Sequence, residues 1–452
     1  MKEGISVIGL GKLGAPMAAC FAAKRFSVVG VDVDARKVEA INRGEPPVFE
    51  PQLAQMLASS DGRLSATPDI EAAVLATNVT FIVVATPSEP GGGFSLRYVL
   101  LACERIGQAL RRKDAFHVVA LTSTVMPGST GGAVRRALEG ATGRCAGEHF
   151  GLCYNPEFIA LGSVIRDFLN PDLLLIGESD TRSGAILADI YRRVCENRPP
   201  AARMNFINAE ITKLAINTYV TTKISFANML ARICECLPGA SVDVVTSALG
   251  LDSRIGSKYL KGAISYGGPC FPRDNRALAM LAQQLGTRAD IAEVTDSFNR
   301  SQIRWLADLV EGCLPDGGTV GVLGLTYKPH TDVIEEAAGF LLAQELAARH
   351  VSVVVFDPAG GRDSPPVLEK RLEFAATALE CIAKADVVVV ATPWPEFSAI
   401  AGEQWTRPSS PRTVIDCWRR LKFIEKLDGV NYLCLGTGGT LLNTTRVAVT
   451  QP

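Results

Sequence analysis

The sequence predicts an α/β protein in which two Rossmann-like doubly wound domains are joined by a long central helix and a helical middle domain. Strand-like apolar runs alternate with helical stretches in the first part of the chain, and the same alternation returns after residue 312. The segment between them reads as helical throughout. Alternating strands and helices are typical of a parallel sheet covered by helices on both faces. We therefore expect domains at residues 1–204, 205–312 and 313–452.

The first region contains short apolar runs that each end in a characteristic residue type. "ISVIGLG" ends in glycines, "SVVGVDVD" ends in acids and "VTFIVVATP" ends in Thr-Pro, and they are followed by "HVVALTSTV", "FGLCYNPEF" and "DLLLIG". Such near-continuous apolar runs indicate buried strands. After "PDGG", the runs "TVGVLGLTYKP", "VSVVVFDP" and "ADVVVVATPWPEF" repeat the order of glycine turn, acid and Thr-Pro. The repetition predicts a second domain of the same kind.

A long helix is predicted over residues 207–237, because this segment contains no proline or glycine. Asn208 is its expected N-cap, and Glu210 suits the positive N-terminal end of the helix dipole. At 1.5 Å per residue the helix spans roughly 45 Å, longer than a small domain is wide. A helix of this length bridges two domains and presents a face for dimerisation.

Composition excludes several function classes. The chain has 452 residues, 47% hydrophobic and 21% charged, with a formal net charge of −1, so nothing favours nucleic acid or an anionic membrane as a partner. No apolar run approaches the roughly 20 residues of a membrane span, and no cleavable signal pattern is present. A cytoplasmic enzyme is expected. Twelve cysteines without a C-x-x-C pair and four scattered histidines predict buried thiols and no metal site.

The stretch "GLGKLG" places Gly9, Gly11 and Gly14 in the G-x-G-x-x-G spacing between a predicted strand and a helix. Glycines there permit a tight turn and let a pyrophosphate approach the helix N-terminus. Asp32 ends the next strand, where an acid binds the adenosine ribose hydroxyls and repels a 2′-phosphate. These residues predict NAD as the cofactor.

Other candidate residues have open interpretations when each is taken alone. Lys328 follows the second glycine turn, either as a phosphate ligand or as an exposed lysine. Lys213 and Asn217 share a helix face, and spacing alone favours a solvated lysine beside a helical asparagine. Glu157 and Thr124 follow strands, as helix caps or as catalytic groups.

The stretch "SYGGPCFPRD" places Cys270 in a Gly- and Pro-rich loop beside Arg273 and Asp274. Thiolates are favoured near cations and backbone donors. The loop by itself leaves open whether this thiol is reactive or inert.

Taken together and in order, "GLGKLG", "VATPSEPGGG", "TSTVMPG", "NPEF", "FLNPDLLLIG", "AEITKLAINT", "RIGSKYLKGAISYGGPCFPRD" and "VLGLTYKPHTD" resemble the UDP-glucose/GDP-mannose dehydrogenase family over nearly the whole chain. The resemblance implies an N-terminal NAD domain, a central helix used for dimerisation and a C-terminal nucleotide-sugar domain. It also implies a four-electron oxidation of the sugar's C6 alcohol to a carboxylate with two NAD⁺.

The resemblance assigns roles to individual residues. Cys270 forms a thiohemiacetal and then a thioester, and Lys213 with Asn217 stabilises the oxyanion. Asp274 orients or activates water, while Glu157 and Thr124 handle protons or serve thioester hydrolysis. The implied cofactor contacts are Gly9, Gly11, Leu13, Gly14, Asp32, Lys37, Thr86, Pro87, Thr124 and Arg273. The implied substrate contacts are Phe158, Lys213, Asn217, Arg254, Tyr259, Lys261, Gly267, Lys328 and, from the loosely matching "DCWRR", Arg419; the family's arginine can come from the partner subunit.

The chain departs from the family pattern at several substrate-facing positions. Leu161 stands where a glutamate is usual after "NPEF", and Glu335 stands where an arginine is usual. Pro269 replaces a serine before Cys270. We expect UDP-glucose as the substrate, followed by GDP-mannose or a UDP-N-acetylhexosamine, and a homodimer or higher homo-oligomer. The alternatives are a single-step β-hydroxyacid dehydrogenase, which does not need Cys270, and an inactive nucleotide-sugar-binding homologue.

Overall fold

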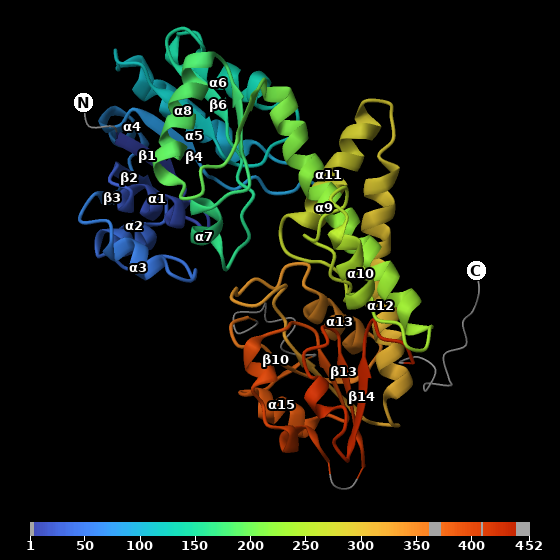
Figure 1. Cartoon of the computed structure of the whole chain (residues 1–452). Coiled ribbons are helices and arrows are strands. Elements are labelled where there is room, and N and C mark those ends of the chain that lie inside the picture. The colour runs from blue at the N-terminus through green and yellow to red at the C-terminus, as the bar shows by residue number, and fades with distance from the viewer. Residues whose placement is uncertain (1–3, 361–371, 408–409, 440–452) are drawn as a thin grey trace. The chain divides into compact units, whose positions relative to one another are not determined.

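The computed structural model describes residues 4–360, 372–407 and 410–439. The chain divides into two compact units, Met1–Ala215 and Ile216–Pro452 (Figure 1). The boundary falls inside the long helix α9. The helical middle region, which the sequence suggested as a separate domain, therefore packs with the C-terminal sheet in one compact unit.

The N-terminal unit contains an eight-stranded sheet in the order β3-β2-β1-β4-β5-β6-β7-β8. Every neighbouring pair is parallel except β6 and β7, which run antiparallel. The sequence predicted the strands but not this reversal, because an apolar run carries no information about strand direction. The strands are β1 (Gly4–Ile8), β2 (Ser27–Val31), β3 (Leu64–Thr67), β4 (Val79–Ile82), β5 (Val118–Leu121), β6 (Gly151–Tyr154), β7 (Leu174–Glu178) and β8 (Ala201–Met204).

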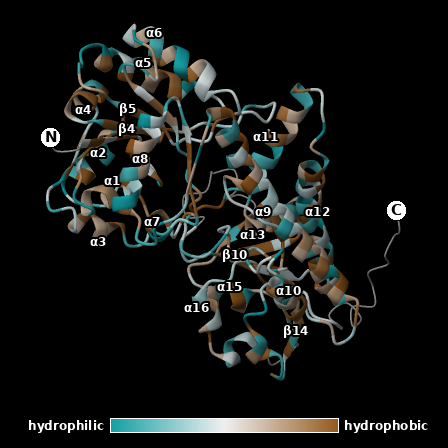
Figure 2. Ribbon diagram, turned by 45° about the horizontal axis from the view of Figure 1, so that its top comes forward, coloured by the Kyte–Doolittle hydropathy of each residue, from teal (hydrophilic) through white to brown (hydrophobic). Residues whose placement is uncertain are grey.

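Helices cover both faces of this sheet, which confirms the doubly wound architecture. In β5, Val118 and Ala120 join the core under α1, α7 and α8, whereas Val119 and Leu121 join the core under α4, α5 and α6. In Figure 2 the helices at the surface carry both hydrophobic and hydrophilic colours, as amphipathic helices do. The helices are α1 (Gly14–Ala23), α2 (Ala35–Asn42), α3 (Leu53–Ala58), α4 (Ile70–Ala76), α5 (Arg97–Arg111), the π-helical η1 (Thr130–Val134), α6 (Arg135–Thr142), α7 (Val164–Leu169) and α8 (Thr181–Val194).

The predicted long helix is α9 (Phe206–Glu235), 30 residues in length. Its N-cap is Asn205, whose Oδ1 accepts the N–H of Asn208 at 2.9 Å. The expectation that Asn208 caps the helix was wrong by three residues, because β8 ends at Met204 and the helix begins directly after one linking residue.

Glu210, in the second turn of α9, is a buried tether rather than a solvated partner of the helix dipole. Its carboxylate accepts the N–H of Gly128 at 2.6 Å and the N–H of Thr130 at 2.7 Å. Gly128 lies in the loop that follows β5, and Thr130 is the first residue of η1. The long helix therefore fixes the loop that carries Thr124.

The C-terminal unit contains a six-stranded, wholly parallel sheet in the order β11-β10-β9-β12-β13-β14. Val353 and Val355 of β10 pack under α12 and α13, and Val354 packs under α15 on the other face. The elements are α10 (Val242–Leu251), α11 (Phe271–Gln284), α12 (Asp290–Cys313), β9 (Thr319–Leu323), α13 (Ala338–Ala348), β10 (Ser352–Phe356), β11 (Glu373–Phe374), α15 (Ala378–Lys384), β12 (Val387–Val390), α16 (Pro395–Ser398), η2 (Gly402–Trp405), β13 (Arg412–Asp416), η3 (Lys422–Ile424) and β14 (Val430–Cys434).

The acid at the end of β10 differs from its counterpart in the first sheet. Asp357 Oδ2 accepts the N–H groups of Leu325 and Thr326 at 2.7 and 2.9 Å and the indole N–H of Trp394 at 3.1 Å. Its Oδ1 accepts two further backbone N–H groups. Both oxygens of Asp357 are therefore occupied by hydrogen bonds that hold the neighbouring glycine turn.

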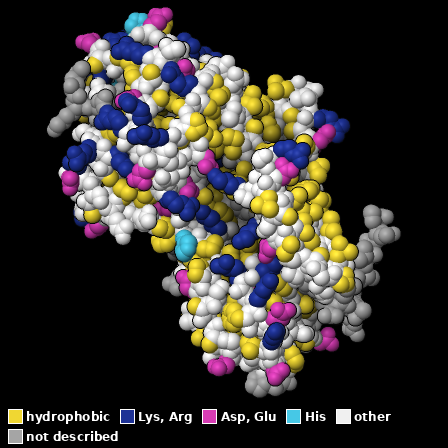
Figure 3. Space-filling model, in the orientation of Figure 1, with side chains coloured by type: hydrophobic (Ala, Val, Ile, Leu, Met, Phe, Trp, Pro, Cys, Tyr) yellow, Lys and Arg dark blue, Asp and Glu magenta, His cyan; other side chains and the backbone are white. Residues whose placement is uncertain are grey.

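The helical part of the C-terminal unit exposes large apolar side chains. They include Tyr219, Phe226, Met229 and Ile233 of α9, with Val244 and Leu251 of α10. In Figure 3 hydrophobic side chains gather over this helical part. Among the described residues, no helix combines the length and the apolar character that crossing a membrane requires.

Removing the Glu210 carboxylate tests the tether. Glu210→Ala leaves two buried N–H groups without their acceptor, so we expect the free energy of unfolding to fall by about 2–4 kcal/mol. Urea denaturation followed by circular dichroism measures the change. Glu210→Gln keeps one acceptor oxygen and should lose about half as much, whereas an unchanged Glu210→Ala protein would contradict the tether.

Candidate active site

The glycine turn after β1 has the geometry of a dinucleotide site. Gly9 has a φ of 102°, and a Cβ there would lie 2.5 Å from the Val83 carbonyl oxygen. A Cβ on Gly14 would lie 1.8 Å from the Gly9 carbonyl oxygen, whereas a Cβ on Gly11 would meet nothing within 4 Å. Two glycines therefore permit close packing and Gly11 leaves its side of the turn open. An open turn at the N-terminus of α1, next to the N-cap residue Leu13, fits a pyrophosphate.

The Asp32 carboxylate, at the end of β2, is held in place by backbone hydrogen bonds. Its Oδ2 accepts the N–H of Leu10 at 2.8 Å, and its Oδ1 accepts the N–H of Asp34 at 2.9 Å. Lys37 lies 3.4 Å from the same carboxylate. Each carboxylate oxygen has two lone pairs, so the group retains acceptors for ribose hydroxyls. Unlike Asp357, Asp32 keeps capacity for a ligand.

The loops after β4 and β5 are joined by one of the predicted cofactor residues. Thr86 is buried, and its hydroxyl donates to the Thr124 carbonyl oxygen at 2.8 Å. Pro87 follows directly in the β4 loop. The structure thus places Thr86, Pro87 and Thr124 at adjacent strand ends, at the carboxyl edge where α/β sheets bind ligands.

Lys213 is a buried residue, 6% exposed, so the interpretation of it as a solvated lysine was wrong. Its Nζ donates to the carbonyl oxygen of Glu157 at 2.7 Å. The same ammonium lies 4.5 Å from the centre of the Phe158 ring, a cation–π contact. The turn after β6 and helix α9 therefore place these three predicted residues together.

The carboxyl group of Glu157 has two neighbours that the sequence did not reveal. The Tyr191 hydroxyl on α8 lies 2.7 Å from Glu157 Oε1 and 2.6 Å from Asn155 Oδ1. Part of Glu157 is exposed, but protein atoms surround its carboxyl, and this burial raises its pKa to about 7. Asn155 stands inside the "YNPEF" motif, whereas Tyr191 carries no local signal in the amphipathic sequence of α8.

Cys270 lies in the C-terminal unit, exposed, at the N-cap of α11. Its carbonyl oxygen accepts the N–H of Asp274 at 2.9 Å. Asp274 is buried, and its Oδ2 accepts the amide N–H of Asn217 at 2.6 Å. The structure therefore joins the predicted carboxylate to the predicted amide, and the main chain of Cys270 lies one helical turn before Asp274. Arg273 Nε lies 4.0 Å from Asp274 Oδ1, so this predicted cofactor contact stands beside the buried carboxylate.

The two glycines before Cys270 let its loop pack closely against the segment before α13. A Cβ on Gly267 would lie 2.2 Å from the Glu336 carbonyl oxygen, and a Cβ on Gly268 would lie 2.9 Å from the Tyr327 ring. The N–H of Gly268 donates to the Glu335 carbonyl oxygen at 3.0 Å. Glu335 therefore supports the loop through its backbone, independently of the side-chain change at this position. Nothing in the structure explains Pro269.

The other predicted substrate residues lie at the surface of the C-terminal unit. Arg254 is exposed and pairs with Asp252 at 2.7 Å. Tyr259 is half exposed with a φ of 63°, and Lys261 is exposed two residues later. Lys328 lies in the loop after β9, 5.9 Å from the Tyr327 ring centre. The structure does not join these side chains into one group.

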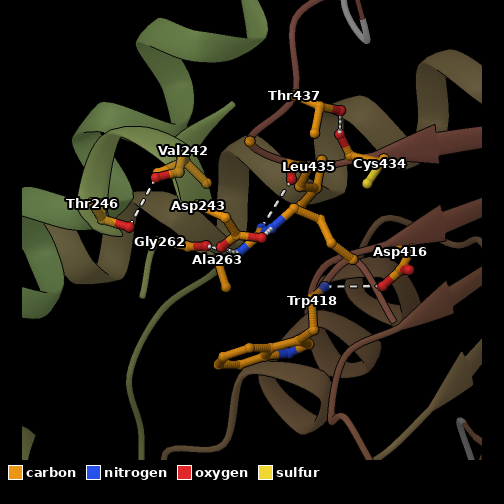
Figure 4. A network of polar contacts seen from close by, with 12 residues as sticks. Val242, Asp243, Thr246, Gly262, Ala263, Asp416, Trp418, Cys434, Leu435 and Thr437 are labelled. Atoms are coloured by element: carbon orange, nitrogen blue, oxygen red, sulfur yellow. Dashed lines mark hydrogen bonds and ion pairs between the residues drawn. The ribbon is translucent and has the colours of Figure 1, made fainter. Parts of the chain in front are cut away.

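Arg419 contacts Asp243, Gly262 and Leu435, three of the residues labelled in Figure 4. Its Nε and Nη2 donate to the Asp243 carboxylate at 2.7 and 2.9 Å, Nη2 also donates to the Gly262 carbonyl oxygen, and Nη1 donates to the Leu435 carbonyl oxygen. The side chain is buried. This arrangement favours a structural role that ties the segment before Cys270 to the end of β14, rather than the predicted substrate contact.

Among the residues that the structure describes, one group of side chains has the composition of a metal site. Cys145, Glu148 and His149 place one ligand atom each within 4.8 Å of one another, and all three are exposed. They lie in the turn before β6. Glu157 and Tyr191 are not part of this group.

Comparison with known proteins covers nearly the whole chain. Residues 3–195 match the NAD binding domain of the UDP-glucose/GDP-mannose dehydrogenase family, residues 207–301 its central domain and residues 321–423 its UDP binding domain. The UDP-glucose 6-dehydrogenase of Haloferax volcanii is 35% identical over 432 residues, which are 95% of this chain and 99% of the relative.

Further relatives differ in the sugar nucleotide in their names. The GDP-mannose 6-dehydrogenase of Pseudomonas aeruginosa is 35% identical over 357 residues, covering 78% of this chain and 80% of the relative. Among solved structures, a UDP-glucose dehydrogenase from Pyrobaculum islandicum superposes with a TM-score of 0.85 at 34% identity, covering 93% of this chain and 96% of that one.

Asp32 gives a test of the cofactor site. The sequence assigns Asp32 to the ribose hydroxyls, and Asp32→Asn removes its charge, so we expect the Kd for NAD to rise about tenfold and discrimination against NADP to weaken. Calorimetric titration of each dinucleotide measures both effects. Asp34→Asn is the matched control, because Asp34 caps α2 and asparagine caps equally well. Equal NAD affinity in the Asp32 variant would contradict the assignment.

Proposed function

Because the chain belongs to the UDP-glucose/GDP-mannose dehydrogenase family, we propose that it is an NAD-dependent UDP-glucose 6-dehydrogenase that forms UDP-glucuronate. The proposal rests on one observation above the others. Cys270 is exposed at the start of α11, one helical turn before Asp274, whose buried carboxylate accepts a hydrogen bond from the Asn217 amide. A single oxidation of an alcohol does not use a nucleophile, whereas a thiol that adds to an aldehyde holds it for a second oxidation and leaves when water attacks.

The oxidation to the carboxylate proceeds through Cys270. Its thiolate adds to the C6 aldehyde carbon and the carbonyl oxygen takes a proton, which gives a thiohemiacetal. NAD, when bound, accepts a hydride at each of the two oxidations. After the second, C6 is a thioester; water attacks it, the C–S bond breaks, and the carboxylate and the Cys270 thiol are released.

Lys213 and Asn217 are the donors for the oxyanion at C6. They lie one turn apart on α9. Lys213 has three N–H groups and Asn217 has two, so a single hydrogen bond to protein leaves each with a donor for the substrate. Donors that the protein already holds in place stabilise charge without reorganisation during the reaction.

Glu157 is the base for hydrolysis of the thioester. Its pKa of about 7, raised by burial, places its ionised form near neutral pH, where a general base is most effective. Thr124 handles protons through a water, and Asp274 orients the water beside Cys270. Arg254, Tyr259, Lys261 and Lys328 contact the sugar nucleotide.

The choice of UDP-glucose follows the relatives. Three UDP-glucose 6-dehydrogenases match 88% or more of the chain at 32–37% identity. GDP-mannose is the second candidate, favoured by relatives at 35% identity. The exposed apolar side chains of α9 and α10 support a homodimer in which this helical face is buried.

The stoichiometry of NADH tests the proposed reaction. With UDP-glucose we expect two NADH for each sugar nucleotide oxidised, and less with GDP-mannose or UDP-N-acetylmannosamine. Cys270→Ser should reduce formation of the carboxylate by at least about a thousandfold. Cys236→Ser is the control, because Cys236 is also exposed. One NADH per sugar, or full activity in Cys270→Ser, would contradict the mechanism.

Glu157 predicts the pH dependence of thioester hydrolysis. A base acts only when ionised, and the raised pKa of about 7 means that protonation removes it below neutral pH. The hydrolysis rate should therefore fall about tenfold for each pH unit below about 7 and level off above it. Rapid-quench measurement of the enzyme thioester follows this rate. Glu157→Gln should accumulate the thioester at every pH, and a wild-type rate independent of pH would contradict the role.

A further inference from the structure

Three side-chain oxygens lie in a row in the N-terminal unit, and their spacing limits where protons can be. The Tyr191 hydroxyl oxygen is 2.6 Å from Asn155 Oδ1 and 2.7 Å from Glu157 Oε1. Tyr191 is fully buried and Asn155 is 1% exposed. Contacts this short between buried oxygens each require a hydrogen.

The orientation of the Asn155 amide is fixed by a second contact. Its Nδ2 donates to the carbonyl oxygen of Leu175 in β7 at 3.1 Å. Turning the amide over would place two carbonyl oxygens against each other there, so Oδ1 faces Tyr191. Asn155 therefore offers Tyr191 an acceptor and no donor.

Only one arrangement of protons places a hydrogen in both short contacts. Tyr191 has one hydroxyl proton, and burial holds its own pKa well above the ordinary value, so the phenol stays neutral. If that proton points to Glu157, the contact with Asn155 has none. If it points to Asn155, the contact with Glu157 is filled only when the Glu157 carboxyl carries a proton of its own.

We propose that Tyr191 and Asn155 are positioning residues that hold Glu157 as a neutral acid in the resting protein, through a chain in which Glu157 donates to Tyr191 and Tyr191 donates to Asn155. Loss of the Glu157 proton then turns the Tyr191 hydroxyl, because a carboxylate is a stronger acceptor than an amide oxygen. The two protonation states differ in the direction of one O–H bond. The catalytic consequence rests on the proposed function of Glu157, whereas the protonation state does not.

The burial of the carboxyl acts in the same direction as this chain, whereas the Lys213 ammonium, which donates to the Glu157 carbonyl oxygen at 2.7 Å, acts against it and lowers the pKa. A Tyr191 hydroxyl that donated to Glu157 throughout would instead favour the ionised carboxylate and lower its pKa. It would also leave the 2.6 Å contact with Asn155 without a hydrogen. The two directions of the hydrogen bond between Tyr191 and Glu157 therefore predict opposite changes in the Glu157 pKa when the phenol is removed.

Infrared titration of the Glu157 carboxyl tests the chain without substrate. The protonated C=O stretch is assigned by its loss in Glu157→Gln, and its midpoint in the wild type should lie near pH 7. Tyr191→Phe removes the acceptor of the acid's proton, so we expect the midpoint to fall by about half a unit to one unit. Asn155→Leu frees the Tyr191 proton to bind the carboxylate, so the midpoint should fall there as well.

Tyr432→Phe is the matched control, because it removes a phenol that donates to Asp416 in the other unit, at 2.8 Å, and should leave the midpoint unchanged. Thermal denaturation checks that each variant folds. A midpoint that rises or does not move in Tyr191→Phe, or that does not fall in Asn155→Leu, overturns the proposal. Agreement of both variants supports it.

The pH profile of thioester hydrolysis separates this proposal from the proposed function. In Tyr191→Phe the acid limb should move to lower pH by the same amount as the infrared midpoint, with the rate at high pH nearly kept. If no sugar nucleotide is oxidised by the wild-type protein, the proposed function fails, and the infrared midpoints still decide the proton chain.

Discussion

Three polar side chains of α9 make hydrogen bonds that each hold another segment of the same compact unit. In the N-terminal unit, Glu210 holds the loop after β5 and Lys213 holds the carbonyl of Glu157. One turn later, in the C-terminal unit, Asn217 holds Asp274. Buried polar groups must be paired, so Glu210 and Lys213 each hold a loop, and Asn217 holds the first turn of α11.

Differences in burial give the carboxyl and thiol groups different protonation states. Glu157 is surrounded by protein, which favours its neutral form, whereas Cys270 is exposed at the beginning of a helix. Burial raises the pKa of other thiols, such as Cys20 and Cys103, to about 12. These thiols stay protonated and behave as small apolar side chains. Cysteine therefore serves as a core residue where it is buried and as a candidate nucleophile where it is exposed.

Much of the fold and part of the site follow from local sequence. The glycine spacing of Gly9 and Gly14 predicts the turn because a Cβ at either position meets backbone. The strands and α9 follow from apolar runs and from the absence of helix breakers. Other features depend on contacts distant in sequence, which is why local patterns missed them. Lys213 looked solvated, but Glu157, 56 positions earlier, supplies its acceptor. Tyr191 meets Glu157 only because α8 packs on the sheet.

The two acids that end β2 and β10 show how a repeated fold acquires distinct halves. Asp32 accepts two backbone N–H groups and keeps lone pairs for another partner. Asp357 accepts backbone N–H groups on both oxygens, together with a hydroxyl and an indole. The acid at this position thus keeps acceptors for a ligand in the first sheet, whereas in the second sheet it only holds the turn beside it. A ribose contact at Asp357 would require breaking the turn that this acid holds, so two sheets with the same order of turns need not bind the same ligand.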